Sequence, residues 1–230
     1  MLYEQISLPK MPDSSKPLRI GLLLFPGFQP LDAFGPIDCL TTLSWTHPLT
    51  LSILSHTFDP VSTKNPFSPN ALSQSILPTH TFTTAPPLDV LLVPGGIGTR
   101  CVDTDPIKAA IAFIAGVYPS LQYLITVCTG AGLAARSGVL DGRRVTTNKR
   151  AFREMEAWGG GKVEWVAKAR WVVDGNVWTS SGVSAGIDVV LAWMGVVYGE
   201  GVARGVADLM EYTRHEDAGV DPFAGLYGLE

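Results

Sequence analysis

Short apolar runs alternate with segments of helical periodicity along the chain. An uninterrupted apolar run bounded by turn residues is typical of a strand that a sheet buries on both faces. Such runs predict strands at residues 18–25, 49–54, 89–93 and 121–127. Apolar positions three or four residues apart predict helices at residues 31–43, 105–117, 152–158, 184–198 and 202–212, and a small-residue helix directly follows the fourth strand.

The order of these elements predicts the fold. Strands that alternate with helices are typical of a parallel sheet covered by helices on both faces. A hairpin is expected at residues 169–173 and 177–180, because Asp174-Gly175-Asn176 between them is a strong turn signal. Short strands are expected near residues 145–147 and, within the Ser-, Thr- and Pro-rich segment 56–87, near 75–77 or 81–83. The prediction is an α/β fold with a doubly wound, mostly parallel sheet.

Length and local composition predict the domain organisation. The chain has 230 residues, which is enough for one domain with a full hydrophobic core. Residues 1–17 are polar and contain three prolines, so we predict a flexible leader there. The remainder, residues 18–230, is predicted to be a single domain.

Charge and hydropathy disfavour several classes of protein. Lys and Arg number 17 against 21 Asp and Glu, and no basic stripe is present, which disfavours a nucleic-acid partner. The most apolar stretch, Ile187 to Tyr198, contains Asp188 and is too short to span a bilayer. The first residues lack the apolar core of a signal peptide, and the three cysteines fit free thiols in a reducing compartment. We therefore expect a cytoplasmic protein without a membrane partner, and we predict neither a metal site nor a cofactor.

Cys128 is the residue whose sequence context most clearly indicates a chemical role. It stands in Thr126-Val-Cys-Thr-Gly130, between an apolar strand and a helix of small residues, which is the pattern of a nucleophile elbow. A helix N-terminus beside the sulfur would favour the thiolate. A free cysteine at such a position can equally be a small core residue, and position alone leaves both interpretations open.

Two other loops are predicted to reach the same edge of the sheet as Cys128. Function in such folds gathers at the carboxyl ends of the parallel strands. In the loop after the first strand, Asp32 is a candidate acid for the thiol. In the loop after residues 89–93, the backbone N–H groups of Gly95, Gly96 and Ile97 could bind an oxyanion. The alternatives are that Asp32 caps a helix and that the glycines only make a turn.

Five motifs follow one another along the chain. They are Phe25-Pro-Gly-Phe28 with Leu31-Asp-Ala-Phe-Gly-Pro36, Val93-Pro-Gly-Gly96, Thr126-Val-Cys-Thr-Gly-Ala131, Gly138-Val-Leu-Asp-Gly-Arg-Arg-Val-Thr-Thr147 and Ser180-Ser-Gly-Val-Ser-Ala-Gly-Ile-Asp188. Their order resembles the ThiJ/PfpI superfamily, whose fold is of the class I glutamine amidotransferase type. The resemblance covers about residues 18–213, most of the chain, and implies a flavodoxin-like sandwich with a nucleophile elbow.

The resemblance implies a site built on Cys128 and Asp32. An acidic residue of the first turn faces the elbow cysteine in this superfamily, and the Leu-Asp-x-x-Gly-Pro spelling here resembles the isonitrile (isocyanide) hydratase branch. The implied reaction converts an isonitrile, as small-molecule substrate, to an N-substituted formamide. Cys128 would be the nucleophile and Asp32 the acid, while Thr129 would orient water. The other implied residues are the backbone donors Gly96 and Ile97 and the substrate contacts Gly27, Phe28 and Gly95. A homodimer is implied as well.

Asn148 departs from the superfamily pattern. Many relatives have His after the Thr-Thr pair, whereas Asn148 follows Thr147 here, so we expect no Cys–His dyad. The substrate pocket is expected to be lined partly by residues 56–87, 97–104 and 148–158.

Several functions remain open as alternatives. They are glyoxalase-like chemistry, amide hydrolysis, a redox or stress sensor in which Cys128 is oxidised, and a binding domain without catalysis. The sequence also resembles the sensor-like domain of AraC-type regulators. We expect no helix-turn-helix pair after residue 213, which disfavours a regulator.

Overall fold

A seven-stranded sheet forms the centre of the computed structural model, which describes residues 18–229. The predicted leader at residues 1–17 lies outside the described residues. The strands of this sheet are β1 (Leu18–Leu23), β2 (Leu49–Ser55), β5 (His80–Thr81), β6 (Val90–Val93), β7 (Tyr123–Val127), β10 (Trp171–Asp174) and β11 (Val177–Ser180). Their order is β10-β11-β7-β6-β1-β2-β5, and all neighbours are parallel except the β10–β11 hairpin.

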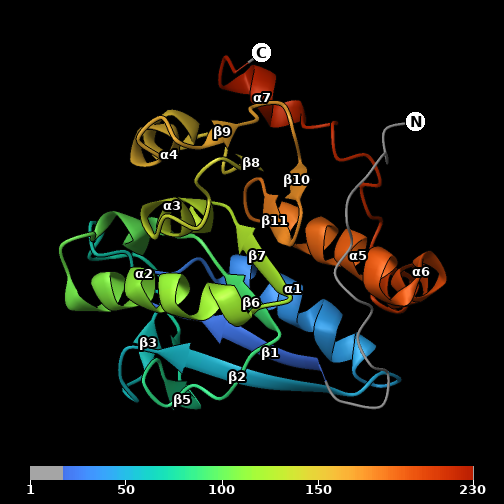
Figure 1. The fold of residues 1–230 in the computed structure, drawn as a ribbon, viewed down its shortest axis with the longest axis horizontal. Coiled ribbons are helices and arrows are strands. Elements are labelled where there is room, and N and C mark those ends of the chain that lie inside the picture. Colours follow the sequence, from blue (N-terminus) through green and yellow to red (C-terminus); the bar gives the residue numbers. More distant parts are fainter. Residues whose placement is uncertain (1–17, 230) are drawn as a thin grey trace.

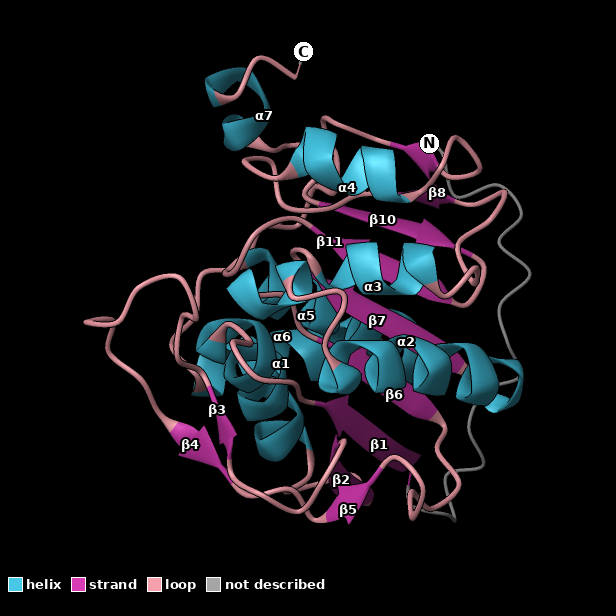
Figure 2. Cartoon of the chain, turned by 90° about the vertical axis from the view of Figure 1, so that its left-hand side faces the viewer, coloured by secondary structure: helices cyan, strands magenta, loops and turns pink. Residues whose placement is uncertain are grey.

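Helices cover both faces of the sheet, as Figures 1 and 2 show. On one face lie α1 (Pro30–Leu43), α5 (Ala185–Tyr198) and α6 (Glu200–Leu209). On the other lie α2 (Asp105–Val117) and α3 (Gly130–Arg136), with α4 (Phe152–Trp158) packed against α3. Outside the sheet are two strand pairs, β3 (Val61–Ser62) with β4 (Ser75–Ile76) and β8 (Arg144–Val145) with β9 (Glu164–Trp165), and the short helices η1 (Ile97–Arg100), η2 (Tyr118–Ser120) and α7 (Pro222–Leu226). In the described part of the chain, no helix has the length and apolarity needed to cross a membrane.

The central strands are apolar on both faces because helices exclude water from both. Every residue of β6 and β7 is buried. In β1 and the turn that follows it, Leu23, Leu24 and Phe25 have no exposed surface. Burial of this apolar surface stabilises the sheet and aligns the carboxyl ends of β1, β6 and β7 at one edge. The predicted α/β fold, with its mostly parallel sheet, is confirmed.

The structure differs from the predicted elements in several places. The strand β9, the turn η1 and the C-terminal helix α7 were absent from the prediction, as was β3. The short strand expected at 145–147 is β8, which ends at Val145 and leaves Thr146 and Thr147 free to bond to other elements.

A buried ion pair joins the hairpin to the start of α5. The Arg170 guanidinium lies 2.6 Å from Asp188 Oδ2, and both side chains are almost fully buried. Asp188 Oδ1 accepts two further bonds, from the Tyr212 hydroxyl and the His215 N–H group. Because a buried charge needs its partners, this cluster fixes β10, α5 and the segment after α6 to one another beside the carboxyl edge of the sheet.

Candidate active site

Cys128 occupies the turn between β7 and α3, with its backbone in the left-handed region at φ 59°. That conformation costs a side-chain-bearing residue roughly 1–3 kcal/mol, so surrounding contacts must hold it. The Cys128 N–H group donates to the carbonyls of Ser180 and Ser181. Its carbonyl accepts from the Thr147 hydroxyl at 2.7 Å. These bonds reach the turn from two other segments and fix the strand–turn–helix geometry of an elbow.

Glycines allow the other two loops to close on this turn. A Cβ at Gly95 would lie 2.5 Å from the Thr129 nitrogen and 2.9 Å from Asp32 Oδ2. A Cβ at Gly130 would collide with the Val93 carbonyl. The first turn of α1, the Gly95–Gly96 loop and the elbow are therefore in contact at one edge of the sheet, as the sequence predicted.

Asp32 lies in the first turn of α1 with only 2% of its surface exposed. Oδ2 accepts a hydrogen bond from the Gly95 N–H group at 2.9 Å, whereas Oδ1 is buried and makes no hydrogen bond of good geometry to another described residue. Burial raises the pKa of this carboxyl to about 7, and the Gly95 N–H group and the Cys128 thiol offset the rise only in part. Asp32 therefore exists in both its acid and its ionised form near neutral pH.

The Cys128 sulfur is held as a thiol rather than as the thiolate that the sequence pattern favoured. Burial, followed by the nearby charge of Asp32, raises the pKa of Cys128 to about 12. The Thr129 and Val183 N–H groups and the Asn148 side chain lower that pKa, but less than burial raises it. The helix N-terminus acts in the expected direction, and desolvation outweighs it.

Asn148, the residue that follows Thr147 in place of the His of the superfamily pattern, lies beside Cys128. Its Oδ1 accepts from the Ala151 N–H group, so its Nδ2 is the atom that faces the sulfur. The same Nδ2 would lie 2.5 Å from a Cβ at position 182, which explains why Gly182 stands there. An amide nitrogen donates hydrogen bonds and does not accept protons. Asn148 can therefore stabilise negative charge on sulfur but cannot serve as a base.

The backbone donors expected in the Gly95–Gly96 loop have acceptors within the protein. The Gly95 N–H group donates to Asp32, and the Gly96 N–H group donates to the Thr129 hydroxyl at 3.0 Å. Both N–H groups therefore have an acceptor within the described part of the chain. Ile97 begins η1, and its N–H group makes no hydrogen bond to another described residue.

Thr129 contacts both the loop and the sulfur. Its hydroxyl lies 3.2 Å from the Thr99 hydroxyl and bonds the Gly96 backbone, so it holds the loop in place. Its backbone N–H group, by contrast, interacts with the Cys128 sulfur. Thr129 thus contributes a backbone donor at the site and a structural hydroxyl beside it.

Gly27 and Phe28, the expected substrate contacts, are engaged in contacts within the protein. The Gly27 N–H group donates to the Ser62 carbonyl, and its own carbonyl accepts from Gly98. The Phe28 ring is 1% exposed and packs edge-on against Phe34. Both residues shape the loop that carries Asp32.

A cavity of about 270 Å³ lies beside Asn148 and Val183, which both interact with Cys128. Residues 56–87 and 97–104 do not line it, contrary to expectation. Its walls come from residues 148–150 and 181–184 and from Phe223 and Tyr227 of the C-terminal segment. The sequence prediction missed this segment, although Asp221-Pro222 repeats the Asp-Pro signal that marks the start of α2.

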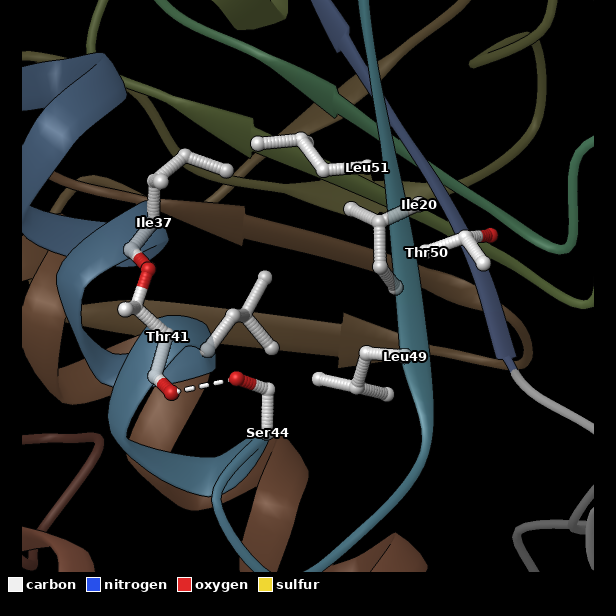
Figure 3. Close-up of a pocket in the computed structure, with 8 residues that line it drawn as sticks. Ile20, Ile37, Thr41, Ser44, Leu49, Thr50 and Leu51 are labelled. Atoms are coloured by element: carbon white, nitrogen blue, oxygen red, sulfur yellow. Dashed lines mark hydrogen bonds between the residues drawn. The ribbon is translucent and has the colours of Figure 1, made fainter.

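Other candidate features lie away from this site. Figure 3 shows an apolar cavity of about 110 Å³ between the last turns of α1 and the first residues of β2, remote from the carboxyl edge. Cys39 is buried in the core, and Cys101 follows η1. Among the described residues, no three His, Cys, Asp or Glu side chains gather as a metal site would require.

Comparison with known proteins agrees with this geometry. A sequence model of the DJ-1/PfpI family matches residues 18–195, more than half of the chain. The chain belongs to the DJ-1/PfpI family. The resemblance inferred from the five motifs is thereby confirmed, and the elbow, the acidic first turn and the Gly95–Gly96 loop all lie within the matched region.

Three relatives indicate the range of the family. The isonitrile hydratase of Pseudomonas putida is 33% identical over 196 residues, which cover 85% of this chain and 79% of that protein. The crystal structure of a ThiJ/PfpI family protein from Pseudomonas syringae superposes with a TM-score of 0.69 at 28% identity, covering 91% of this chain and 83% of that one. The HTH-type transcriptional regulator GbdR of Pseudomonas aeruginosa is 27% identical over 56% of this chain but only 34% of its own length.

The raised pKa of Asp32 predicts how stability depends on pH. A carboxyl whose pKa rises from 3.8 to about 7 on folding binds its proton more tightly in the folded state, so stability falls as the pH rises through that window. Asp32→Asn removes this pH-dependent loss of stability. Urea denaturation should show that the free energy of unfolding of the variant rises relative to that of wild type between about pH 4 and pH 8, by up to about 4 kcal/mol. A stability difference that stays constant across this pH range would contradict the assignment.

Proposed function

We propose that this protein hydrates an isonitrile to an N-substituted formamide, with Cys128 as nucleophile and Asp32 as proton donor. The observation that carries the proposal is the buried pair itself. A carboxyl with a pKa of about 7 faces a thiol with a strongly raised pKa, and no His stands beside them. The similarity to the isonitrile hydratase of Pseudomonas putida supports the same reaction class.

This pair suits a substrate carbon that must gain both a nucleophile and a proton. The terminal carbon of an isonitrile, R–N≡C, is such an atom. Asp32 in its acid form gives a proton to that carbon as the Cys128 sulfur bonds to it, and the thiol proton passes to the Asp32 carboxylate. The sum is addition of S–H to one carbon, which yields a thioimidate, R–N=CH–S–Cys128.

Water completes the reaction. It adds to the thioimidate carbon, the nitrogen takes up a proton, and the C–S bond breaks as the sulfur regains its proton. The product is R–NH–CHO, so one isonitrile and one water give one formamide. Asp32 can relay the protons because its pKa lies near neutral pH, where it gives and takes a proton with little cost.

Three donors surround the sulfur while it carries charge. They are the backbone N–H groups of Thr129 and Val183 and the Nδ2 of Asn148. Because they are fixed before the reaction, they stabilise a developing thiolate without reorganisation. They act on the attacking sulfur in the first step and on the leaving sulfur in the last.

The same features disfavour two alternatives. Amide hydrolysis by a Cys–His dyad needs a His base beside the thiol, and Asn148 is a donor only. Selective oxidation of a sensor cysteine follows its thiolate character, whereas burial and Asp32 keep Cys128 protonated.

Formamide production from cyclohexyl isocyanide tests the proposal directly. Wild-type protein should turn over the substrate, and Cys128→Ala should lose activity by roughly a thousandfold or more because the covalent step is lost. Cys101→Ala, which removes a half-buried thiol outside the site, is the matched control and should retain activity. A folded wild-type protein without turnover, or an active Cys128→Ala, would overturn the proposal.

Asn148 gives a second prediction about the same reaction. Removing its donor in Asn148→Ala should lower kcat roughly tenfold, since one fixed hydrogen bond to the sulfur is lost. Asn148→Asp should lower kcat further, because a second carboxylate beside the sulfur opposes the thiolate. Steady-state kinetics of the two variants and wild type measure this order. Equal activity of Asn148→Asp and wild type would show that the side chain does not act on the sulfur.

A further inference from the structure

The cavity of about 270 Å³ adjoins the proposed site through two of its lining residues. Asn148 and Val183 line it, and both also interact with the Cys128 sulfur. A substrate carbon bonded to that sulfur would therefore have its nitrogen and substituent directed toward this space.

Two aromatic residues of the C-terminal segment line the cavity. Phe223 in α7 and Tyr227 directly after it are 47% and 45% exposed. Gly182 and Val183 line the same cavity, together with polar and charged residues of segments 148–150 and 181–184. Half-exposed aromatic rings and small apolar residues in one cavity suit a flat or cyclic apolar group.

Buried contacts hold this wall in place. Lys149 Nζ lies 3.6 Å from Asp221 Oδ2 in a pair with almost no exposed surface. Asp221 Oδ1 accepts from the Phe223 N–H group and so caps α7, and Ala224 behind it has no exposed surface. Phe223 and Tyr227 are thus presented on a fixed support beside the elbow, although α7 has only five residues.

The volume of the cavity is sufficient for a ring. A closed cavity of about 150 Å³ accommodates benzene. A cavity of about 270 Å³ therefore has room for one six-membered ring with a few further atoms.

We infer that this cavity binds the N-substituent of the substrate, and that Phe223 and Tyr227 select isonitriles that bear an aryl or cycloalkyl ring. This inference rests on the proposed function. The sequence match to the DJ-1/PfpI family ends at residue 195, so both residues lie outside the matched region. Substrate choice is therefore assigned to a segment outside the region that the family model matches.

Kinetics with two substrates test the assignment. Phe223→Ala and Tyr227→Ala should each raise KM for cyclohexyl isocyanide about fivefold, because each removes ring contacts with the substrate, while kcat changes less than twofold. KM for methyl isocyanide, which has no ring, should stay constant. Leu226→Ala is the matched control, because Leu226 is exposed on the same helix but does not line the cavity. Equal shifts for both substrates, or none, would overturn the inference.

Alkylation of Cys128 tests the cavity without turnover. In this reaction the sulfur displaces iodide, so a C–S bond forms as the C–I bond breaks. The measured quantity is the ratio of the alkylation rate with iodoacetanilide to the rate with iodoacetamide. This ratio should be higher for Cys128 of wild type than for free cysteine. Phe223→Ala and Tyr227→Ala should lower it to the value of free cysteine. Mass spectrometry of the Cys128 peptide separates it from Cys39 and Cys101. A protein that shows this preference but hydrates no isonitrile would refute the proposed function alone, whereas an unchanged ratio in both variants would refute the ring-binding cavity.

Discussion

The left-handed backbone at Cys128 is the constraint on which the rest of the site depends. At φ 59° the chain turns sharply from β7 into α3 and raises the sulfur at the carboxyl edge of the sheet. The conformation is unfavourable by itself, and the hydrogen bonds that Cys128 donates to Ser180 and Ser181 and accepts from Thr147 offset its cost. The same turn directs the Thr129 N–H group toward the sulfur and allows the Gly95 loop to approach. Relaxing this one residue would separate the thiol from its donors and from Asp32.

Burial decides the protonation state that this geometry produces. Three donors lower the pKa of the thiol, yet desolvation and the neighbouring carboxyl raise it further, so the proton stays on sulfur. The same burial raises the pKa of the Asp32 carboxyl to about 7. A neutral thiol beside a carboxyl that exchanges protons at neutral pH is suited to adding S–H across one carbon. It is poorly suited to reactions that need a free thiolate.

The sequence predicted the scaffold better than the details of the site. Apolar runs and helical spacing are local signals, so the strands before Asp32, Gly95 and Cys128 and the contact of their three loops could be predicted. The acceptors of the Gly95 and Gly96 N–H groups could not, because Asp32 and Thr129 lie 63 and 33 residues away in the chain. The helix α7 was missed because buried contacts, such as the pair of Lys149 and Asp221, stabilise it rather than its own periodicity. The pKa values were missed for a similar reason, since they follow from burial.

The protonation state of Asp32 is the most direct test of the central claim that burial holds a carboxylic acid beside a neutral thiol. Infrared difference spectra of wild type against Asp32→Asn, recorded as a function of pH, would isolate the carbonyl band of this acid. We predict a carboxylic-acid band that is present in mildly acidic solution and is lost with a midpoint near pH 7, while Cys128 remains a thiol. The absence of that band from pH 5 upward, together with a Cys128 thiolate at neutral pH, would contradict the account.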